Sequence, residues 1–445
     1  MPQRPPGPSS RLWSTIQFAA RPTVMIPRWL SRYGDPLRIP VVNGNVVMTA
    51  QPALVKKIFS TRTSTYSPFA AKGLEAITGP RSVFQLRDQE HRRHRRLIMP
   101  SFHGSRMRAY ATQMQQATRT MFDDAVGRGP VSLHTLTQRI SLEVILRTVF
   151  GVQQPARVAR FAEAITHLVD ATLPAFLFMP FLQRELWGMG PFARLRRRFE
   201  HLDDLLSEQI AQARRDNHGE DILSMLLAAH DEDGGHLDDQ EIRDELRTLL
   251  FAGHETTGIA LSWAMDAVGR HPRVAERLDH ELHALGPDPE PTALAKIPYL
   301  EAVCHETLRL RPIVTEVLRT LHEPLELGDY ALRPPTVVAA SILGIHQRED
   351  LYPQPQQFRP ERFVERKFGP HEFLPFGGGH RRCIGAAFAG FEMQVVLGTV
   401  LREYAVHLQN PASPRPVRRN VTMAPGDGVP VVITRARPGS VRVAA

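Results

Sequence analysis

Residues 376–385 read Phe-Gly-Gly-Gly-His-Arg-Arg-Cys-Ile-Gly, and this stretch decides the fold. Its glycines let the backbone approach a flat object closely and let peptide amides point at the sulfur of Cys383. The adjacent Arg381 and Arg382, with a helix predicted to begin at Ile384, are expected to lower the thiol pKa and favour a thiolate. A thiolate held in such a loop is a nucleophile or a metal ligand. The alternative is an inert buried cysteine.

Three further motifs precede this loop. They are Ala252-Gly-His-Glu-Thr-Thr257, Glu306-Thr-Leu-Arg309 and Pro360-Glu-Arg-Phe363. With the cysteine loop, which matches F-x-x-G-x-R-x-C-x-G at every fixed position, they resemble the cytochrome P450 family in content and order. The resemblance implies a mainly α fold with small β-sheets, a triangular α-rich prism. Haem would lie between a long oxygen-activating helix and the helix that follows the cysteine loop.

The resemblance assigns many of these residues to a haem b cofactor. Cys383 would be the axial ligand of the iron, and its thiolate would push electron density toward the metal. Phe376 would shield the sulfur, and Gly379 and Gly385 would keep the backbone close to the porphyrin. Small residues at 252–253 would leave room for the co-substrate O2. The other expected cofactor contacts are Ala252, Gly377 and the propionate-binding cations His91, Arg95, Arg319 and Arg381.

Two acidic residues have different expected roles. In the family, a carboxylate and the adjacent threonine hydroxyl relay protons to the bound oxygen, which makes Glu255 and Thr256 the expected catalytic pair. The alternative for Thr256 is a hydroxyl bonded back to its own helix. Glu306 and Arg309 share one helical face, and the family precedent adds Arg362 to form a cluster that locks the haem-binding core.

The substrate pocket is predicted from position relative to the motifs. Its residues are mainly apolar, so a hydrophobic small molecule is expected. The similarity of stretches 94–110 and 250–257 to soluble bacterial hydroxylases suggests a fatty acid, terpenoid or polyketide. The pocket candidates are Thr248, Phe251, Ala252, Val314, Thr315, Val317 and Met423, followed by the 66–84 loop and the Phe176–Leu182 segment.

The span of the motifs that carry the resemblance implies a single domain over residues 1–445, with a Pro-rich lead-in over 1–20, of which residues 1–12 are expected to be extended. A β-hairpin is predicted about Asn43-Gly44. Helices are predicted near 104–126, 132–150, 155–170, 192–216, 238–269 and 272–284, and strands near 325–327, 336–340 and 431–434. The apolar stretch 171–182 is short and contains Pro174 and Pro180, so it is a core segment or a lid rather than a membrane anchor. We therefore expect a cytoplasmic monomer.

The charge and cysteine content of the chain narrow the range of possible binding partners. The chain has 55 Lys+Arg and 46 Asp+Glu among 445 residues, a net charge of 55 − 46 = +9, and only two cysteines, which excludes a disulfide scaffold. Seven arginines lie between residues 87 and 108 against only Asp88 and Glu90. They predict docking of an acidic ferredoxin or flavodoxin, whose reductase would deliver NAD(P)H electrons indirectly. No motif supports nucleic-acid binding.

Other interpretations of the motifs fit less well. His254-Glu255 begins like a zinc-protease motif but lacks its second histidine, and Gly377-Gly378-Gly379 lacks the residues of a phosphate loop. The leading hypothesis is a haem-thiolate monooxygenase that hydroxylates or epoxidises its substrate. A peroxide-driven peroxygenase is the first alternative, although Glu255 and Thr256 argue against it. A non-enzymatic haem or ligand carrier is the second.

Overall fold

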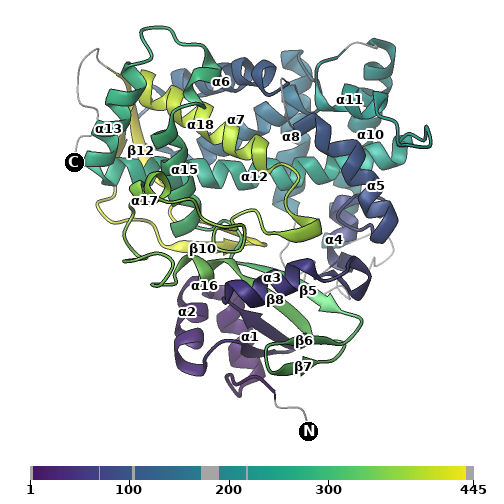
Figure 1. Ribbon diagram of the computed structural model, residues 1–445. Helices are drawn as coiled ribbons and strands as arrows, with labels where there is room; N and C mark the ends of the chain where they lie inside the picture. Colours follow the sequence, from purple (N-terminus) through teal and green to yellow (C-terminus); the bar gives the residue numbers. More distant parts are fainter. Residues whose placement is uncertain (1–3, 70, 103–105, 172–189, 217–218, 437–445) are drawn as a thin grey trace.

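The computed structural model describes residues 4–69, 71–102, 106–171, 190–216 and 219–436 (Figure 1). Its helices are α1 (Arg11–Ala20), α2 (Pro22–Tyr33), α3 (Pro52–Ser60), α4 (Ala71–Thr78), α5 (Asp88–Ile98), α6 (Arg106–Ala125), α7 (Leu133–Thr148), α8 (Pro155–Ala171), α10 (Pro191–Asp216), α11 (Ile222–Ala228), α12 (Asp239–Arg270), α13 (Pro272–His283), α14 (Pro291–Leu294), α15 (Pro298–Leu310), α16 (Ile342–His346), α17 (Glu361–Glu365) and α18 (Ala386–Glu403), with short 3₁₀ turns at Thr63–Thr65, Met99–Phe102 and Gly379–Arg381. Among the helices described, none is long and apolar enough to cross a membrane.

The strands form four small sheets. They are β1 (Leu37–Val41), β2 (Gly44–Thr49), β3 (Tyr66–Pro68), β4 (Val131–Ser132), β5 (Glu316–Leu321), β6 (Leu325–Leu327), β7 (Tyr330–Leu332), β8 (Val337–Ser341), β9 (Tyr404–Leu408), β10 (Pro416–Arg419), β11 (Thr422–Pro425) and β12 (Pro430–Arg435). The largest sheet has the order β1-β2-β8-β5-β3, in which β2 and β8 run parallel and the other pairs run antiparallel.

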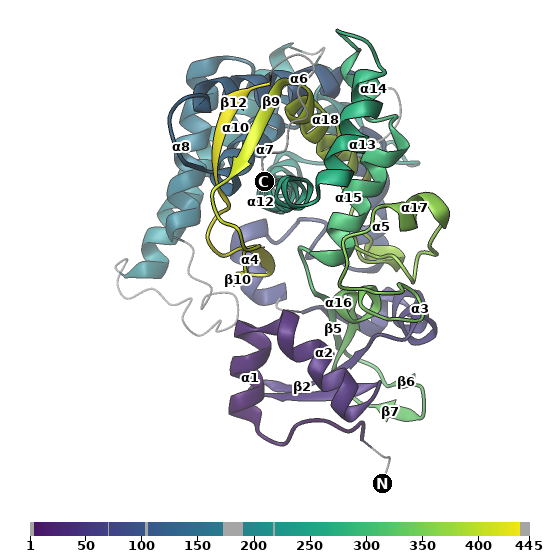
Figure 2. The ribbon, with the colours of Figure 1, turned by 90° about the vertical axis from the view of Figure 1, so that its left-hand side faces the viewer.

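The helical part of the molecule is built around α12. This helix of 32 residues is capped by the preceding Asp238, whose side chain accepts a hydrogen bond from the Glu241 backbone while the Glu241 side chain accepts one from the Asp238 backbone. Such a reciprocal cap satisfies two backbone donors that the helix cannot bond itself. α7 packs along α12, and α18 packs against both α12 and α6 (Figures 1 and 2). Their apolar faces form one large core.

The largest sheet forms a second part of the molecule with α1, α2 and α3, drawn at the bottom of both views (Figures 1 and 2). Two smaller apolar clusters lie on either side of this sheet. The segment that leads from β8 through α16 and α17 to the cysteine loop connects the sheet back to the helical part. The cysteine loop therefore lies where the two parts of the molecule meet.

The predicted helices agree with the structure to within about two residues, but three details differ. The hairpin turn consists of Val42 and Asn43, because Val41 pairs with Gly44. The lead-in is shorter than predicted: α1 begins at Arg11, since the Ser10 side chain accepts a hydrogen bond from the Trp13 backbone and caps the helix. The helix after the cysteine loop begins at Ala386 rather than Ile384.

Candidate active site

The cysteine loop is held by close packing on α3. Gly379 has a positive φ of 67°, and a Cβ atom there would lie 2.2 Å from the carbonyl oxygen of Phe59. A Cβ at Gly378 would lie 2.4 Å from the ring of Phe59. Only glycine fits such contacts. Approach to α3 therefore explains Gly378 and Gly379, whereas the sequence had connected Gly379 with the porphyrin. The loop closes with a hydrogen bond of 3.0 Å from the Cys383 backbone N–H to the Phe376 carbonyl.

The Cys383 side chain is exposed in the structure. It keeps exposed surface although protein surrounds it densely enough for burial to raise the pKa of its thiol. The Gly385 backbone, Arg382 and Arg95 lower that pKa without outweighing burial. The predicted direction was thus wrong for the protein alone, and Arg95 takes the place of Arg381. Added Cβ atoms at Gly385 and Gly390 would meet nothing within 4 Å, so open space continues along the start of α18.

Helix α12 supplies the other predicted motif. Ala252 is exposed in the middle of this helix, between residues that are buried or half-buried. A Cβ at Gly253 would lie 2.8 Å from the Ile145 side chain, so this glycine lets α7 pack closely on α12. Of the two small residues, only Ala252 is exposed.

The acid and the alcohol on α12 have separate partners. The Thr256 hydroxyl donates to the Ala252 carbonyl at 2.6 Å, which is the back-bonded arrangement given above as its alternative. A carboxylate oxygen of Glu255 accepts a hydrogen bond of 3.3 Å from the Thr422 hydroxyl. Burial raises the pKa of Glu255, whereas Thr422 and the nearby Arg419 lower it. Sequence reasoning missed Thr422, because β11 brings it from 167 residues away and no local pattern marks it.

Three of the four residues predicted to bind propionates form an unbalanced positive site. Among the residues described, none of Arg95, Arg319 and Arg381 forms an ion pair with a carboxylate. Their guanidinium groups donate to backbone carbonyls instead, at Arg382, Ile58 and Leu86 respectively.

The charges of these groups act on one another. Burial lowers the pKa of Arg319 to about 10, and Arg381 adds to this effect. Burial, Arg381 and Arg95 lower the pKa of His91 to about 3, which keeps it neutral. Nδ1 of His91 is buried with no hydrogen-bond partner among the described residues. Burying a cation without a counter-charge costs free energy. An anion bound among these arginines would therefore stabilise the site.

These observations fit haem. The group is flat, carries two carboxylates and takes a thiolate as axial ligand. The open space beside Gly385, the converging cations and the partly exposed thiol of Cys383 match those three properties in turn. The α12 motif contributes Ala252, a small side chain that is exposed.

Glu306 lies at the centre of a buried ion-pair cluster. Its carboxylate accepts two hydrogen bonds from Arg309, of 2.6 and 2.8 Å, and one of 3.1 Å from Arg362. The Arg359 backbone donates a fourth, of 2.9 Å. Arg309 also donates to the carbonyls of His346, Pro355 and Gln357. The cluster thus ties α15 to the segment that leads into the cysteine loop.

A second set of polar contacts fixes α4 and the chain after it against α12. Arg247 donates to the carbonyls of Ala76 and Ile77 at 2.6 and 3.0 Å, and Thr248 donates to that of Thr78 at 3.3 Å. The carboxylates of Asp244 and Glu245 accept from the backbone N–H groups of Arg81 and Val83. We call these four α12 residues the α4 clasp. Sequence reasoning had named only Thr248, as a pocket residue.

The other predicted pocket residues differ in exposure. Val314 and Val317 are half-buried, and Phe251 is half-buried with its ring 5.9 Å from that of Phe199. Thr315 and Met423 are 1% and 2% exposed, so packed protein surrounds them. The Phe176–Leu182 segment, like most of 171–182, lies outside the described residues.

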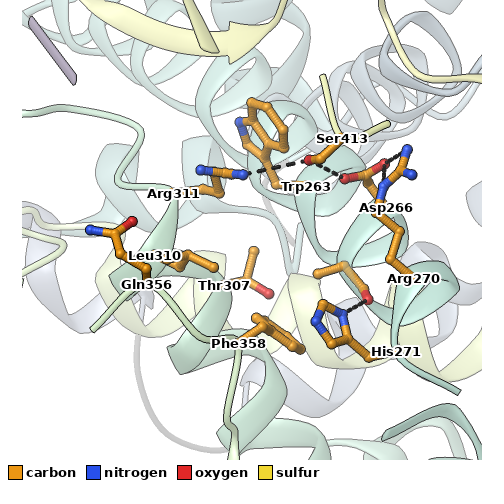
Figure 3. A pocket seen from close by; sticks show the side chains of 11 residues that line it. Trp263, Asp266, Arg270, His271, Thr307, Leu310, Arg311, Gln356, Phe358 and Ser413 are labelled. Atoms are coloured by element: carbon orange, nitrogen blue, oxygen red, sulfur yellow. Dashed lines mark hydrogen bonds and ion pairs between the residues drawn. The ribbon is translucent and has the colours of Figure 1, made fainter. Parts of the chain in front are cut away.

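A separate cavity of about 150 Å³ lies between α12, α15 and the segment before β10 (Figure 3). There Asp266 pairs with Arg270 at 2.8 Å and accepts a hydrogen bond of 3.1 Å from Ser413. The Ser413 hydroxyl in turn accepts from Arg311 at 3.5 Å. None of the predicted site residues lines this cavity, and its charged groups satisfy one another, so we assign it no function.

The basic segment 87–108 is partly neutralised. Arg93 pairs with Asp231 at 2.7 Å and donates to the His236 carbonyl, and Arg96 pairs with Glu232. The acidic loop at 230–239 therefore packs against α5. Arg92 is exposed and forms no ion pair among the described residues.

The site suits a flat group with two negative charges, and it lies between a cysteine loop and a long helix. Such a site is typical of haem-thiolate proteins. The family model for cytochrome P450 matches residues 2–429. The protein described as cytochrome P450 135B1 of Mycobacterium tuberculosis (strain ATCC 25618 / H37Rv) is 36% identical over 416 residues, which cover 91% of this chain and 86% of that one. Cytochrome P450 138 of the same strain is 32% identical over 434 residues, covering 96% and 95%. The chain belongs to the cytochrome P450 family and is a cytochrome P450 monooxygenase.

Solved structures agree. The retinoic acid bound cyanobacterial CYP120A1 has a TM-score of 0.85 and 25% identity, with 98% of this chain and 100% of that one covered. The cytochrome P450DA heme domain has a TM-score of 0.86 at 20% identity, covering 100% of both chains, and shows the fold alone. Family membership implies haem with a cysteine thiolate and O2 as co-substrate.

Proposed function

We propose that Cys383 is the axial ligand of haem b and that His91, Arg95, Arg319 and Arg381 bind its propionates. The protein would insert one oxygen atom of O2 into a hydrophobic substrate by hydroxylation or epoxidation. The observation that carries this proposal is that one buried arginine, Arg319, and two half-buried ones, Arg95 and Arg381, have no carboxylate partner among the described residues, while the thiol of Cys383 is exposed. The haem, when bound, supplies the activation of O2. Phe376, Gly377 and Gly385 would position the loop beneath it.

The residues of this chain would handle protons and exclude water. Glu255, whose pKa burial raises above its ordinary value, holds a proton more readily than an exposed carboxyl group. We propose that it passes the proton through ordered water to the Thr256 hydroxyl. The Thr256 hydroxyl would leave its bond to the Ala252 carbonyl to take part. Glu306, Arg309 and Arg362 would hold the cysteine loop in place.

The proposed substrate class rests on those predicted pocket residues that are apolar and partly exposed. Phe251, Val314 and Val317 are apolar and keep some exposed surface. The buried residues Thr248, Thr315 and Met423 would lie behind the side chains that line the pocket and support them. The cyanobacterial CYP120A1 structure is bound to retinoic acid, an apolar chain with a carboxylate. We propose a substrate of similar character, a fatty acid, terpenoid or polyketide.

Turnover with isotopically labelled O2 tests the reaction. The haem-loaded protein is supplied with NADPH, a ferredoxin and its reductase, together with a panel of lipids and terpenes. We expect product that contains one labelled oxygen atom. Product formed only with hydrogen peroxide would identify a peroxygenase, and binding without any product would identify a carrier. Both results would contradict the proposal.

We propose that electrons come from a separate acidic ferredoxin or flavodoxin, which docks beside Cys383 on α5. Arg92 is available for docking, whereas Arg93 is engaged by Asp231. We expect Arg92→Glu to slow reduction about fivefold at low salt, with a smaller effect at high salt. Stopped-flow reduction measures both. The control is Arg333→Glu, an exposed arginine between β7 and β8. Equal slowing by both variants would contradict docking on α5.

We also propose that the protein acts as a cytoplasmic monomer.

A further inference from the structure

Exposed large apolar side chains gather in one region. Ten such residues are exposed in the part of the chain that the structure describes, and seven of them come from α1, the start of α2, the β1–β2 turn and the β10–β11 hairpin. We call these seven residues the α1 face: Leu12, Trp13, Ile16, Val24, Val42, Val417 and Val421. Leu12 and Val24 are the most exposed of these residues, at 66% and 59%. Scattered exposed residues are ordinary, but a cluster marks an interaction surface.

The elements that carry the α1 face contact one another. α1 packs against both β1 and β10. The Thr15 hydroxyl of α1 accepts a hydrogen bond of 3.0 Å from the backbone of Val42. The Arg418 guanidinium lies over the Phe18 ring, 6.0 Å from its centroid. Figure 2 shows α1 and β10 on the same side of the molecule, one below the other. The face is therefore continuous across three separate stretches of chain.

The same stretches hold nearly all the excess charge. Residues 1–34 and 410–426 contain eight arginines and no Asp, Glu or Lys. The rest of the chain has 55 − 8 = 47 Lys+Arg against 46 Asp+Glu, a net charge of +1. Arg418 pairs with Glu316 at 3.0 Å. The other seven are exposed and form no ion pair among the described residues: Arg4, Arg11, Arg21, Arg28, Arg32, Arg415 and Arg419.

We propose that the α1 face binds peripherally to the surface of an anionic lipid bilayer. Aliphatic and tryptophan side chains beside arginines, on an amphipathic helix, suit insertion at the level of the lipid headgroups. An acidic protein would satisfy the arginines but would not account for the six exposed Leu, Ile and Val residues of the α1 face, because Leu and Val are under-represented among the residues that carry binding energy at protein interfaces. The binding does not depend on the haem chemistry, and its test measures no turnover.

Vesicle sedimentation of the haem-loaded full chain tests this proposal. The vesicles contain phosphatidylcholine alone or with phosphatidylglycerol, at low and high salt. We expect binding to the anionic vesicles at least about tenfold tighter than to the neutral ones, weakening as salt rises. Leu12→Gln with Ile16→Gln should weaken binding about tenfold, because two apolar side chains no longer enter the bilayer. Arg11→Gln with Arg28→Gln should do the same and reduce the salt dependence.

Control variants separate binding from folding. Val364→Gln changes a valine that is 50% exposed on α17, outside the α1 face, and should bind as the wild type does. The haem spectrum and thermal unfolding of every variant are recorded, and Val24→Gln replaces the α1 pair if that pair misfolds. Failure of the wild type to bind anionic vesicles at low salt would overturn the proposal. Wild-type binding by the variants of the α1 face would also overturn it, as would retention by an acidic protein without retention by vesicles.

Discussion

At the scale of single residues, Glu306 shows how much one buried carboxylate can organise. It is 0% exposed and balances Arg309 and Arg362, which are 0% and 4% exposed. A bare E-x-x-R pattern is more often a solvated helix pair, so only its order among the other motifs predicted the cluster. Its four hydrogen-bond donors come from residues up to 56 positions away, and no local pattern specifies that geometry.

We expect Glu306→Gln to destabilise the fold by about 3 kcal/mol or more, because it leaves two buried guanidinium groups without a counter-charge. The measurement is urea unfolding of the haem-loaded protein. The matched control is Glu365→Gln, which breaks an exposed pair with Arg359 and should cost less than about 1 kcal/mol. Equal losses in the two variants would contradict the role given to Glu306.

At the scale of elements, α12 combines two functions along one face. Its first half carries the α4 clasp, and Ala252 and Glu255 follow within the next two turns. The chain just after α4 is thus fixed from two sides, because Arg381 of the cysteine loop also donates to the carbonyls of Phe84 and Leu86. The clasp places the 66–84 region next to the proposed oxygen site.

We expect Arg247→Met to loosen α4, since the carbonyls of Ala76 and Ile77 lose their charged donor. Hydrogen exchange of residues 73–83 should become about tenfold faster or more. Arg243→Met, one turn earlier on α12, is the control, because Arg243 only reaches Ser207 at 3.4 Å. Unchanged exchange in the Arg247 variant would show that α4 is held by apolar packing instead.

The sequence predicted the elements better than their ends and contacts. Apolar periodicity located α6, α7, α8, α10, α12 and α13, because each buries one face in the core. The start of α1 was missed although Ser10 before Arg11 is an N-cap signal, since the neighbouring prolines suggested an extended chain. Gly379 was assigned to the porphyrin and Gly253 to a space for O2, and Gly378 was given no role of its own. Only the tertiary structure shows that they meet Ile145 and Phe59.

At the scale of the whole molecule, the structure relocates the positive charge. The sequence predicts the arginine-rich 87–108 segment as the main basic surface, but the 230–239 loop pairs with Arg93 and Arg96. The excess lies on the segments around α1 instead. A single domain over residues 1–445 stays a prediction.

Buried neutral histidines make stability depend on pH. Burial lowers the pKa of His346 to about 3, and the ring accepts a hydrogen bond from the Leu374 backbone. As pH falls from 7 to 5, the unfolded chain protonates this histidine near 6.5 while the fold keeps it neutral, so the free energy of unfolding decreases. Glu392 has the opposite slope, because burial raises its pKa to about 8.

The test therefore compares slopes. Urea unfolding at pH 7, 6 and 5 should show that the wild type loses about 1–2 kcal/mol more over this range than His346→Gln does. The variant has its own cost at every pH, which cancels in the comparison of slopes. Parallel curves for the two proteins would mean that His346 titrates normally in the fold.

The central claim is that Cys383 binds the haem iron as a thiolate. The most direct measurement is the absorption spectrum of the reduced, CO-bound protein. We predict a strongly red-shifted Soret band in the wild type and its loss in Cys383→Ala, while Cys304→Ala, which removes the buried cysteine of α15, keeps the band. An unshifted band in well-folded, haem-loaded wild type, or a shifted band that survives Cys383→Ala, would contradict the account.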